Sequence, residues 1–277
     1  MKESARKTGL ASGEFYDGTS LLEEARRYKT SREFLEIMRS NFYHADQLVA
    51  VGVGPRLLAV SCSLPQTFIG RDINPGSIQR ALEFARDWKR YRQAEPFKTE
   101  FDWLDQERVQ VKLDRIDEWT FELGSSFGNE NADGYLASEL FLHMSHAEVK
   151  GVFQEARRVL YSSGRMVFTV YPSGREDSLD EQFAELAGKA GVARRKVIRS
   201  GELNVKFLAD KLAEAMPEIY GANKTKFWLD LQKIRVFKEE DIERMCKDAG
   251  LTLTFKQDVR CGMFPFAYRL VYSARRM

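Results

Sequence analysis

The chain has 277 residues, 43% of them hydrophobic, and its 43 Lys and Arg residues nearly balance 41 Asp and Glu residues. A chain of this length buries about three quarters of its unfolded surface, so it needs neither a disulfide nor a metal ion to fold. The formal net charge of +2 argues against a dedicated nucleic-acid-binding protein, because such proteins carry a large basic excess.

The chain carries no sequence signal for export or for a membrane. Residues 1–14 are polar and lack the apolar segment of a secretory signal, and no apolar run reaches the ~18 residues that cross a bilayer. Cys62, Cys246 and Cys261 are widely spaced, which favours reduced, partly buried thiols. No cluster has metal-ligand spacing. We expect a cytoplasmic globular protein without a bound metal.

The first two thirds of the chain alternate between short apolar runs and helical patterns. Residues 1–46 are expected to form a polar tail and two amphipathic helices, broken near Thr30 and Ser31. The core region, 47–171, follows with strands expected at 47–53, 67–73, 109–113, 134–137 and 165–171 and helices at 75–93 and 145–160, the last strand entered through a Ser-Ser-Gly turn at 162–164.

The pattern changes after Tyr171. Residues 172–236 show no convincing strand pair, and helices are expected at 179–191, 205–216 and 225–234, so this segment is predicted to be a helical cap. Residues 237–277 return to the first pattern, with a helix at 238–249 and strands at 251–257 and 268–273. Strands separated by helices predict a doubly wound α/β fold with a mostly parallel sheet.

A glycine turn and a carboxylate suggest the ligand. Gly52 and Gly54 end the first strand, where the lack of a Cβ lets a ligand approach the backbone. Asp72 ends the second strand, 20 residues after Gly52, where a carboxylate can accept both hydroxyls of a ribose. Together they predict an adenosine-containing cofactor, either a dinucleotide or S-adenosylmethionine (SAM).

Two later segments favour SAM. The fourth strand with its following turn, residues 132–144, and the helix, turn and strand at 153–170 closely resemble the class I SAM-dependent methyltransferase family. The resemblance covers roughly residues 47–171 and 237–273. It implies a Rossmann-like seven-stranded methyltransferase sheet, closed by an antiparallel pair at 251–257 and 268–273, with N-terminal helices and an inserted helical cap.

The resemblance also implies a set of cofactor contacts. Gly52 and Gly54 would hold the methionine part of SAM, and Asp72 would bind the ribose diol. The remaining contacts would come from Ile73 on the adenine face, Asp114 on the adenine amino group with Arg115 beside it, and Ser138 and Glu139 along the methionine side.

The glycine loop departs from the family in two places. Ala50 stands where the family usually has an acidic residue that helps to hold the SAM amino group, and Pro55 and Arg56 follow Gly54 in place of a third glycine. A Gly-x-Gly-Pro turn also occurs in nicotianamine-synthase-like enzymes, which transfer the aminobutyl part of SAM and release methylthioadenosine. That chemistry, and a scaffold that no longer binds SAM, stay open as alternatives.

The substrate side is less defined. His143, after the fourth strand, is a candidate general base, and Tyr171, at the end of the fifth, is a candidate hydrogen-bond donor or aromatic face toward the sulfonium. The basic run Arg194, Arg195, Lys196 and Arg199 would suit an anionic substrate. We expect methyl transfer to a small molecule, such as an anionic secondary metabolite or its precursor. The sequence leaves the oligomeric state open, a homodimer included.

Overall fold

The computed structural model describes residues 32–52, 67–72, 110–115, 128–175, 181–189, 235–260 and 267–277, with single positions and short pieces between residues 79 and 214. The segment 1–31 lies outside the described residues, and the helices expected at 75–93, 205–216 and 225–234 lie almost entirely outside them.

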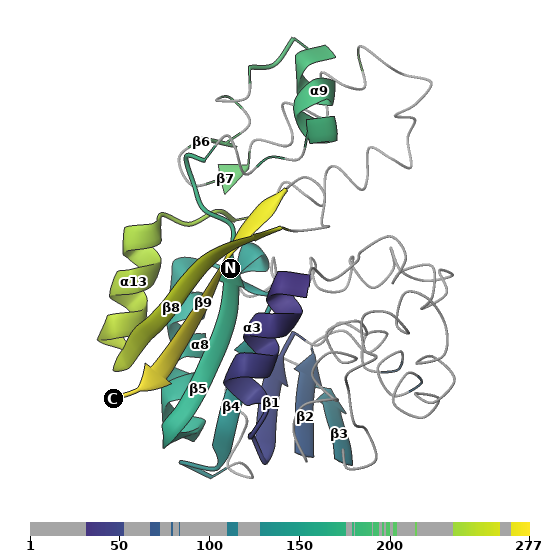
Figure 1. Cartoon of the computed structure of the whole chain (residues 1–277). Helices are drawn as coiled ribbons and strands as arrows, with labels where there is room; N and C mark the ends of the chain where they lie inside the picture. Colours follow the sequence, from purple (N-terminus) through teal and green to yellow (C-terminus); the bar gives the residue numbers. More distant parts are fainter. Residues whose placement is uncertain are drawn as a thin grey trace.

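The described strands form one mixed sheet of seven strands (Figure 1). Its order is β3-β2-β1-β4-β5-β9-β8, and the first five are parallel, whereas β9 runs antiparallel to both β5 and β8. The carboxyl ends of the parallel strands therefore meet at one edge, called the carboxyl edge below. The strands are β1 (Gln47–Val51), β2 (Thr67–Asp72), β3 (Gln110–Arg115), β4 (Ala132–Ala137), β5 (Leu160–Val170), β8 (Leu251–Arg260) and β9 (Tyr268–Arg276).

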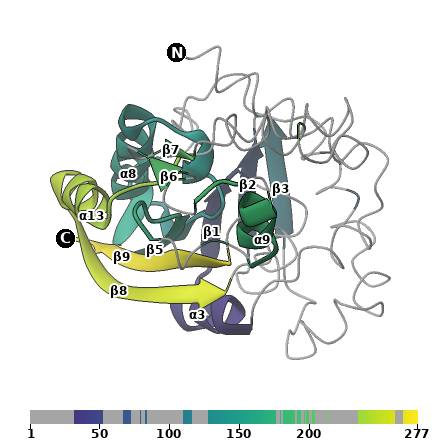
Figure 2. The same cartoon turned by 90° about the horizontal axis from the view of Figure 1, so that it is seen from above.

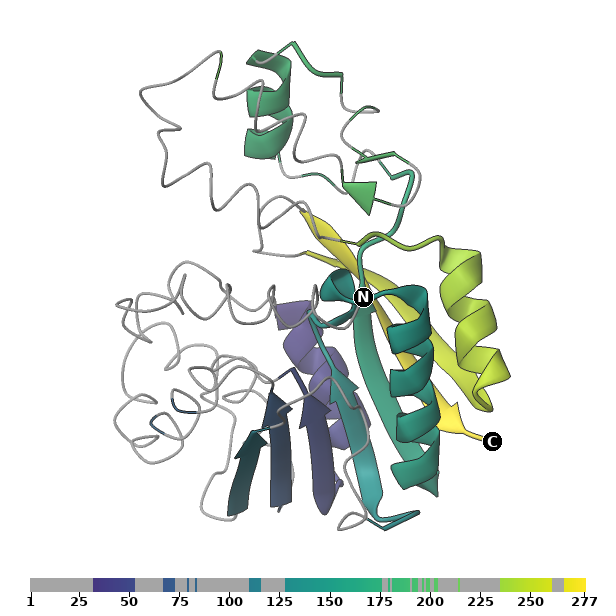
Figure 3. The ribbon, with the colours of Figure 1, turned by 180° about the vertical axis from the view of Figure 1, so that it is seen from behind.

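Helices cover both faces of this sheet (Figures 2 and 3). Helix α3 (Arg32–Phe42) lies on one face and buries one apolar side, as helical spacing requires. Helices α8 (His146–Val159) and α13 (Glu239–Asp248) lie on the other face. Helix α8 begins with a capping box, in which the Glu148 N–H donates to Ser145 Oγ (3.4 Å) and the Ser145 N–H donates to the Glu148 carboxylate (2.6 Å).

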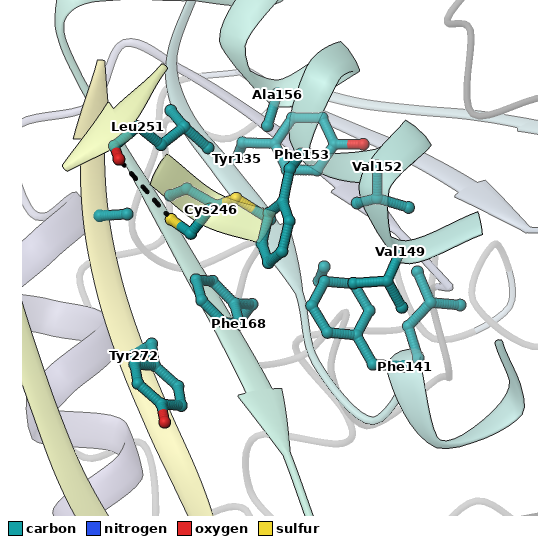
Figure 4. Packing of buried hydrophobic residues seen from close by; sticks show 14 of the residues in the cluster. Tyr135, Phe141, Val149, Val152, Phe153, Ala156, Phe168, Cys246, Leu251 and Tyr272 are labelled. Carbon is teal, nitrogen blue, oxygen red and sulfur yellow. Dashed lines mark hydrogen bonds between the residues drawn. The ribbon is translucent and has the colours of Figure 1, made fainter. Parts of the chain in front are cut away.

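The main core lies between the sheet and the α8–α13 layer (Figure 4). Phe168 of β5 is fully buried at its centre, where its ring lies 5.0 Å from that of Phe153 and 5.1 Å from the stacked ring of Tyr272. Cys246 is a free, buried thiol that donates to the Leu251 carbonyl (3.9 Å), and burial raises its pKa to about 12. The expectation of a reduced thiol is confirmed for Cys246, whereas Cys62 and Cys261 lie outside the described residues.

The expected start of the fifth strand was wrong. β5 begins at Leu160 and runs through residues 162–164 without a turn, and it pairs with β4 on both sides of an irregularity. Ala132 pairs with Leu160, and Gly134 pairs with Arg165. Between these two pairs β5 contains more residues than β4, and the additional residues form an irregularity within the strand. Gly164 suits this course, because an added Cβ would lie 3.1 Å from the Ala132 carbonyl oxygen.

The segment between β5 and α13 leaves and re-enters the sheet at one point. The Phe237 N–H donates to the Tyr171 carbonyl (2.9 Å) and the Ser173 N–H donates to the Phe237 carbonyl (2.8 Å). Beyond the carboxyl edge lie α9 (Glu181–Lys189) and an antiparallel ribbon of β6 (Ile198–Arg199) and β7 (Glu202–Leu203). The absence of a strand pair was therefore a wrong expectation, because two-residue strands are too short to show an alternating pattern.

Replacing Gly134 by alanine is expected to destabilise the fold by about 1–3 kcal/mol through overpacking. An added Cβ would lie 2.7 Å from Leu48 Cδ1 and 2.8 Å from Phe42 Cδ1, and both side chains are fully buried. Gly188 of α9 is the matched control, since a Cβ there meets nothing within 4 Å. Urea unfolding of both variants tests this, and equal midpoints would contradict it.

Candidate functional site

The carboxyl edge places the candidate site where β1 lies between β2 and β4. The chain leaves β1 toward β2 and β3 on one side and later continues from β4 to β5 on the other, and such a switch point is where open α/β sheets bind ligands. Gly52 follows β1 with a left-handed backbone (φ 72°), and its N–H donates to the Arg71 carbonyl (2.9 Å). A Cβ at Gly52 would lie 2.8 Å from Leu140 Cδ1, so the residue after Glu139 packs directly on this glycine. Gly54 lies outside the described residues.

The ends of β2 and β3 are adjacent at the same edge. Asp72 is the last residue of β2, is half-buried, and pairs in register with Arg115 of β3, while Arg71 pairs with Asp114. The backbone thus brings Asp72, Asp114 and Arg115 to adjacent strand ends, although the side chains of the last two lie outside the described residues, as does Ile73.

The residues after β4 have an unusual backbone. Ser138 is buried. The backbone of Glu139 adopts a left-handed conformation (φ 56°) that residues other than glycine seldom take. The Glu139 N–H donates to Thr169 Oγ1 of β5 (2.7 Å), which fixes this conformation. Local strain of this kind is concentrated at functional sites, so the position deserves a functional explanation.

The Glu139 carboxylate lies in a network built from three other elements. The Tyr171 hydroxyl and the Arg269 guanidinium of β9 both donate to it, and Arg269 also forms an ion pair with it. The guanidinium carbon of Arg269 lies 4.4 Å from the centre of the Phe34 ring of α3. Tyr171 and Arg269 are buried, whereas the Glu139 side chain keeps 22% of its surface exposed.

Arg269 and Thr169 belong to this network but were not predicted from the sequence. Residue 269 is 130 positions from Glu139, and only the pairing of Val170 with Leu270 places it beside Tyr171. The available signal was an arginine directly before the apolar run at residues 270–272 of β9, where a buried charge requires a partner.

His143 lies in a short 3-10 helix, Phe141–His143, directly after β4. Its Nδ1 atom is buried, and among the described residues no group forms a hydrogen bond with it. Burial lowers the pKa of His143 to about 4. At neutral pH the imidazole is therefore uncharged, the form that a base requires, but its basicity is low.

The lowered His143 pKa predicts acid sensitivity between pH 6.5 and 4. In that window the unfolded state binds a proton that the folded state does not, so the free energy of unfolding falls by up to about 1.4 kcal/mol per pH unit as the pH decreases. His143→Gln is expected to flatten this slope, and His44→Gln, at an exposed position, is expected to keep it. Urea unfolding across the window measures the slopes, and identical slopes in all three proteins would contradict the assignment.

A separate groove lies away from the carboxyl edge, near the start of β5. Arg165 and Arg275 are directly opposite each other there, and Arg165 donates to the Ser40 carbonyl in the last turn of α3 (3.5 Å). A cation at a helix C-terminus is a common stabilising arrangement. This groove therefore has a structural explanation and is not our candidate site.

Two further properties concern only the described residues. None of their helices has the length and apolar character needed to cross a membrane. No group of three or more His, Cys, Asp or Glu side chains among them is placed to hold a metal ion.

Comparison with known proteins identifies the fold. No protein-family model and no curated protein matches this chain. A magnesium protoporphyrin IX methyltransferase from Synechocystis PCC 6803, solved with S-adenosylhomocysteine (SAH), is 12% identical, and the match covers 98% of this chain and 100% of the other with a TM-score of 0.53. A 1,6-didemethyltoxoflavin N1-methyltransferase from Burkholderia thailandensis, solved with 1,6-didemethyltoxoflavin and SAH, is 14% identical over 99% of this chain and 89% of the other, with a TM-score of 0.53. The chain has the class I methyltransferase fold.

Another structural neighbour carries the name of a different enzyme class. A protein assigned to the Zn-dependent alcohol dehydrogenases of Rhodobacter sphaeroides is 14% identical over 100% of both chains, with a TM-score of 0.62. A classic dinucleotide-binding sheet has the order 3-2-1-4-5-6, with parallel strands. Here β9 is antiparallel and lies between β5 and β8, which confirms the antiparallel closing pair implied by the resemblance to methyltransferases.

Proposed function

We propose that this protein is a SAM-dependent methyltransferase that acts on a small molecule. The observation that carries the proposal is the left-handed Gly52 beside Asp72 at the switch point of a methyltransferase fold. The residues present fit the cofactor, since Gly52 forms a left-handed turn directly after β1, and the half-buried Asp72 offers a carboxylate at the neighbouring strand end. Structural neighbours solved with SAH support the same cofactor.

Each predicted residue then has a role toward SAM. Backbone groups of Gly52 and Gly54 would hold the methionine part, and Asp72 would accept the two ribose hydroxyls. Adenine would lie against Ile73, with its amino group toward Asp114 and Arg115. Ser138 and Glu139 would border the methionine side.

The chemistry requires alignment more than proton transfer. Bound SAM supplies an electrophilic methyl group on a sulfonium, and in-line displacement gains most from the positioning of the nucleophile. His143, with a pKa of about 4, is a weak base, which favours a nucleophile that loses its proton readily. Tyr171 donates to Glu139, so we assign it as a positioning residue beside the reacting groups.

The segment 172–236 is proposed as a cap over the substrate. Helix α9 and the β6–β7 ribbon lie beyond the carboxyl edge, above the strand ends that carry the candidate residues. A cap at this place would enclose a small molecule and exclude water. The basic run at residues 194–199 would give it affinity for an anionic substrate.

The nucleoside product tests the reaction. The protein is incubated with SAM and a protein-free extract of small metabolites, and the nucleosides are separated and identified by mass spectrometry. Methyl transfer predicts SAH above the level formed by an Asp72→Ala variant. Methylthioadenosine in place of SAH would overturn methyl transfer and favour aminobutyl transfer or cyclisation.

A further inference from the structure

We propose that the Glu139 carboxylate, held by Arg269 and Tyr171, binds the α-ammonium group of SAM. This inference rests on the proposed function and names the protein group that would hold one particular charge of the cofactor. A methionine chain carries a primary ammonium that cannot be left without acceptors in a partly buried site.

The strand ends around Gly52 differ in the charged groups that they offer. The last residues of β1 are Val49, Ala50 and Val51, all buried and apolar, so β1 offers no charged group. Among the described side chains at the ends of β2 and β4, the carboxylates are Asp72 and Glu139. Asp72 is on the β2 side, where the ribose is proposed to lie. Glu139 is therefore the carboxylate on the β4 side of the glycine turn.

Glu139 lies next to the glycine turn through the residue that follows it. Leu140, the residue after Glu139, occupies the position that a Cβ at Gly52 would require, with its Cδ1 at 2.8 Å. Glu139 therefore directly precedes the residue whose side chain packs against the glycine that would hold the methionine part. The left-handed conformation of Glu139 and the hydrogen bond from its N–H to Thr169 Oγ1 fix the backbone there.

The Glu139 carboxylate can accept further hydrogen bonds. A carboxylate offers about four acceptor positions. Arg269 donates to Oε1 and Tyr171 donates to Oε2, and the Thr169 hydroxyl lies 3.5 Å from Oε1. Both strong donors are buried, and 22% of the Glu139 side chain is exposed, so acceptor capacity remains on a group that is already oriented. Binding of an ammonium group there would require little further ordering of the Glu139 side chain, so the entropic cost of binding would be small.

The test compares ligands that differ only in the amino-acid part. Isothermal titration calorimetry measures the binding of SAH, of SAH lacking its amino group, and of methylthioadenosine, which lacks the whole amino-acid end. The variants are Glu139→Gln and the matched control Glu130→Gln. Glu130 also has a φ of 56° and pairs with a β9 arginine, Arg276, but lies outside the proposed site.

Glu139→Gln is expected to weaken SAH binding by about 10- to 100-fold, the cost of losing a charge-assisted hydrogen bond, and to leave methylthioadenosine binding within about twofold of wild type. Removing the amino group from SAH should cost wild type a similar factor and cost Glu139→Gln little. Glu130→Gln should bind all three ligands as wild type does.

Two results would overturn this assignment alone: equal SAH affinity in wild type and Glu139→Gln, or loss of methylthioadenosine and SAH together. The wild-type comparison of SAH with its deaminated form tests the assignment even where the variant folds poorly, and equal affinities refute it. Wild-type protein that binds neither SAH nor methylthioadenosine would refute the proposed function itself, and this inference with it.

Discussion

Replacing Phe168 by alanine is expected to lower the free energy of unfolding by about 3–5 kcal/mol, the usual cost of truncating a buried aromatic side chain. The ring is fully buried and contacts three other aromatic rings, those of Phe141, Phe153 and Tyr272. These rings come from the 3-10 helix after β4, from α8 and from β9. The cavity would therefore loosen the layer that supports the carboxyl edge.

The matched control is Phe255→Ala on β8, where the ring is 39% exposed. Exposed substitutions usually change stability by about 0.5 kcal/mol or less, so this variant should unfold close to wild type. Guanidinium unfolding followed by circular dichroism gives both values. A Phe168→Ala midpoint equal to that of Phe255→Ala would contradict the packing described here.

Replacing Asp72 by alanine is expected to weaken SAH binding by about 100-fold or more, because two charge-assisted hydrogen bonds to the ribose would be lost together. The measurement is thermal unfolding with and without SAH. A ligand at 100 times its dissociation constant stabilises the folded state by about 2.7 kcal/mol. Wild type should show that gain at such a concentration, and Asp72→Ala should show almost none.

Asp248→Ala is the control for the loss of a carboxylate, since Asp248 is exposed at the end of α13. It should keep the full stabilisation by SAH. Equal stabilisation of all three proteins would show that Asp72 does not bind the ribose. The Asp72→Ala protein without ligand should unfold cooperatively, which separates loss of binding from loss of fold.

Local signals in the sequence predicted much of the fold. The apolar run of β1, the glycine after it and the helical spacing of the apolar residues of α8 are patterns within a short window, and the structure has each of them. The strand ends were placed less well. β5 and β9 extend beyond the predicted ranges, because pairing with neighbouring strands continues where the apolar pattern stops.

The candidate site was predicted in part. Gly52 and Asp72 lie at adjacent strand ends, as the spacing predicted, because parallel neighbours end at one edge. The Glu139 network could not be predicted from the sequence, because it depends on the register of β5 with β9 and on the position of Phe34 on α3. No pattern within a short window encodes those contacts. The low pKa of His143 likewise follows from burial, which the sequence around it does not reveal.

The central claim is that the carboxyl edge of this sheet binds SAM. Isothermal titration calorimetry of SAM and of SAH into the purified, folded wild-type protein tests it most directly. The account predicts micromolar binding of both ligands with one site per chain. A folded sample that binds neither ligand would contradict this claim. It would instead favour the alternative that the protein has a methyltransferase fold but serves as a scaffold that does not bind SAM.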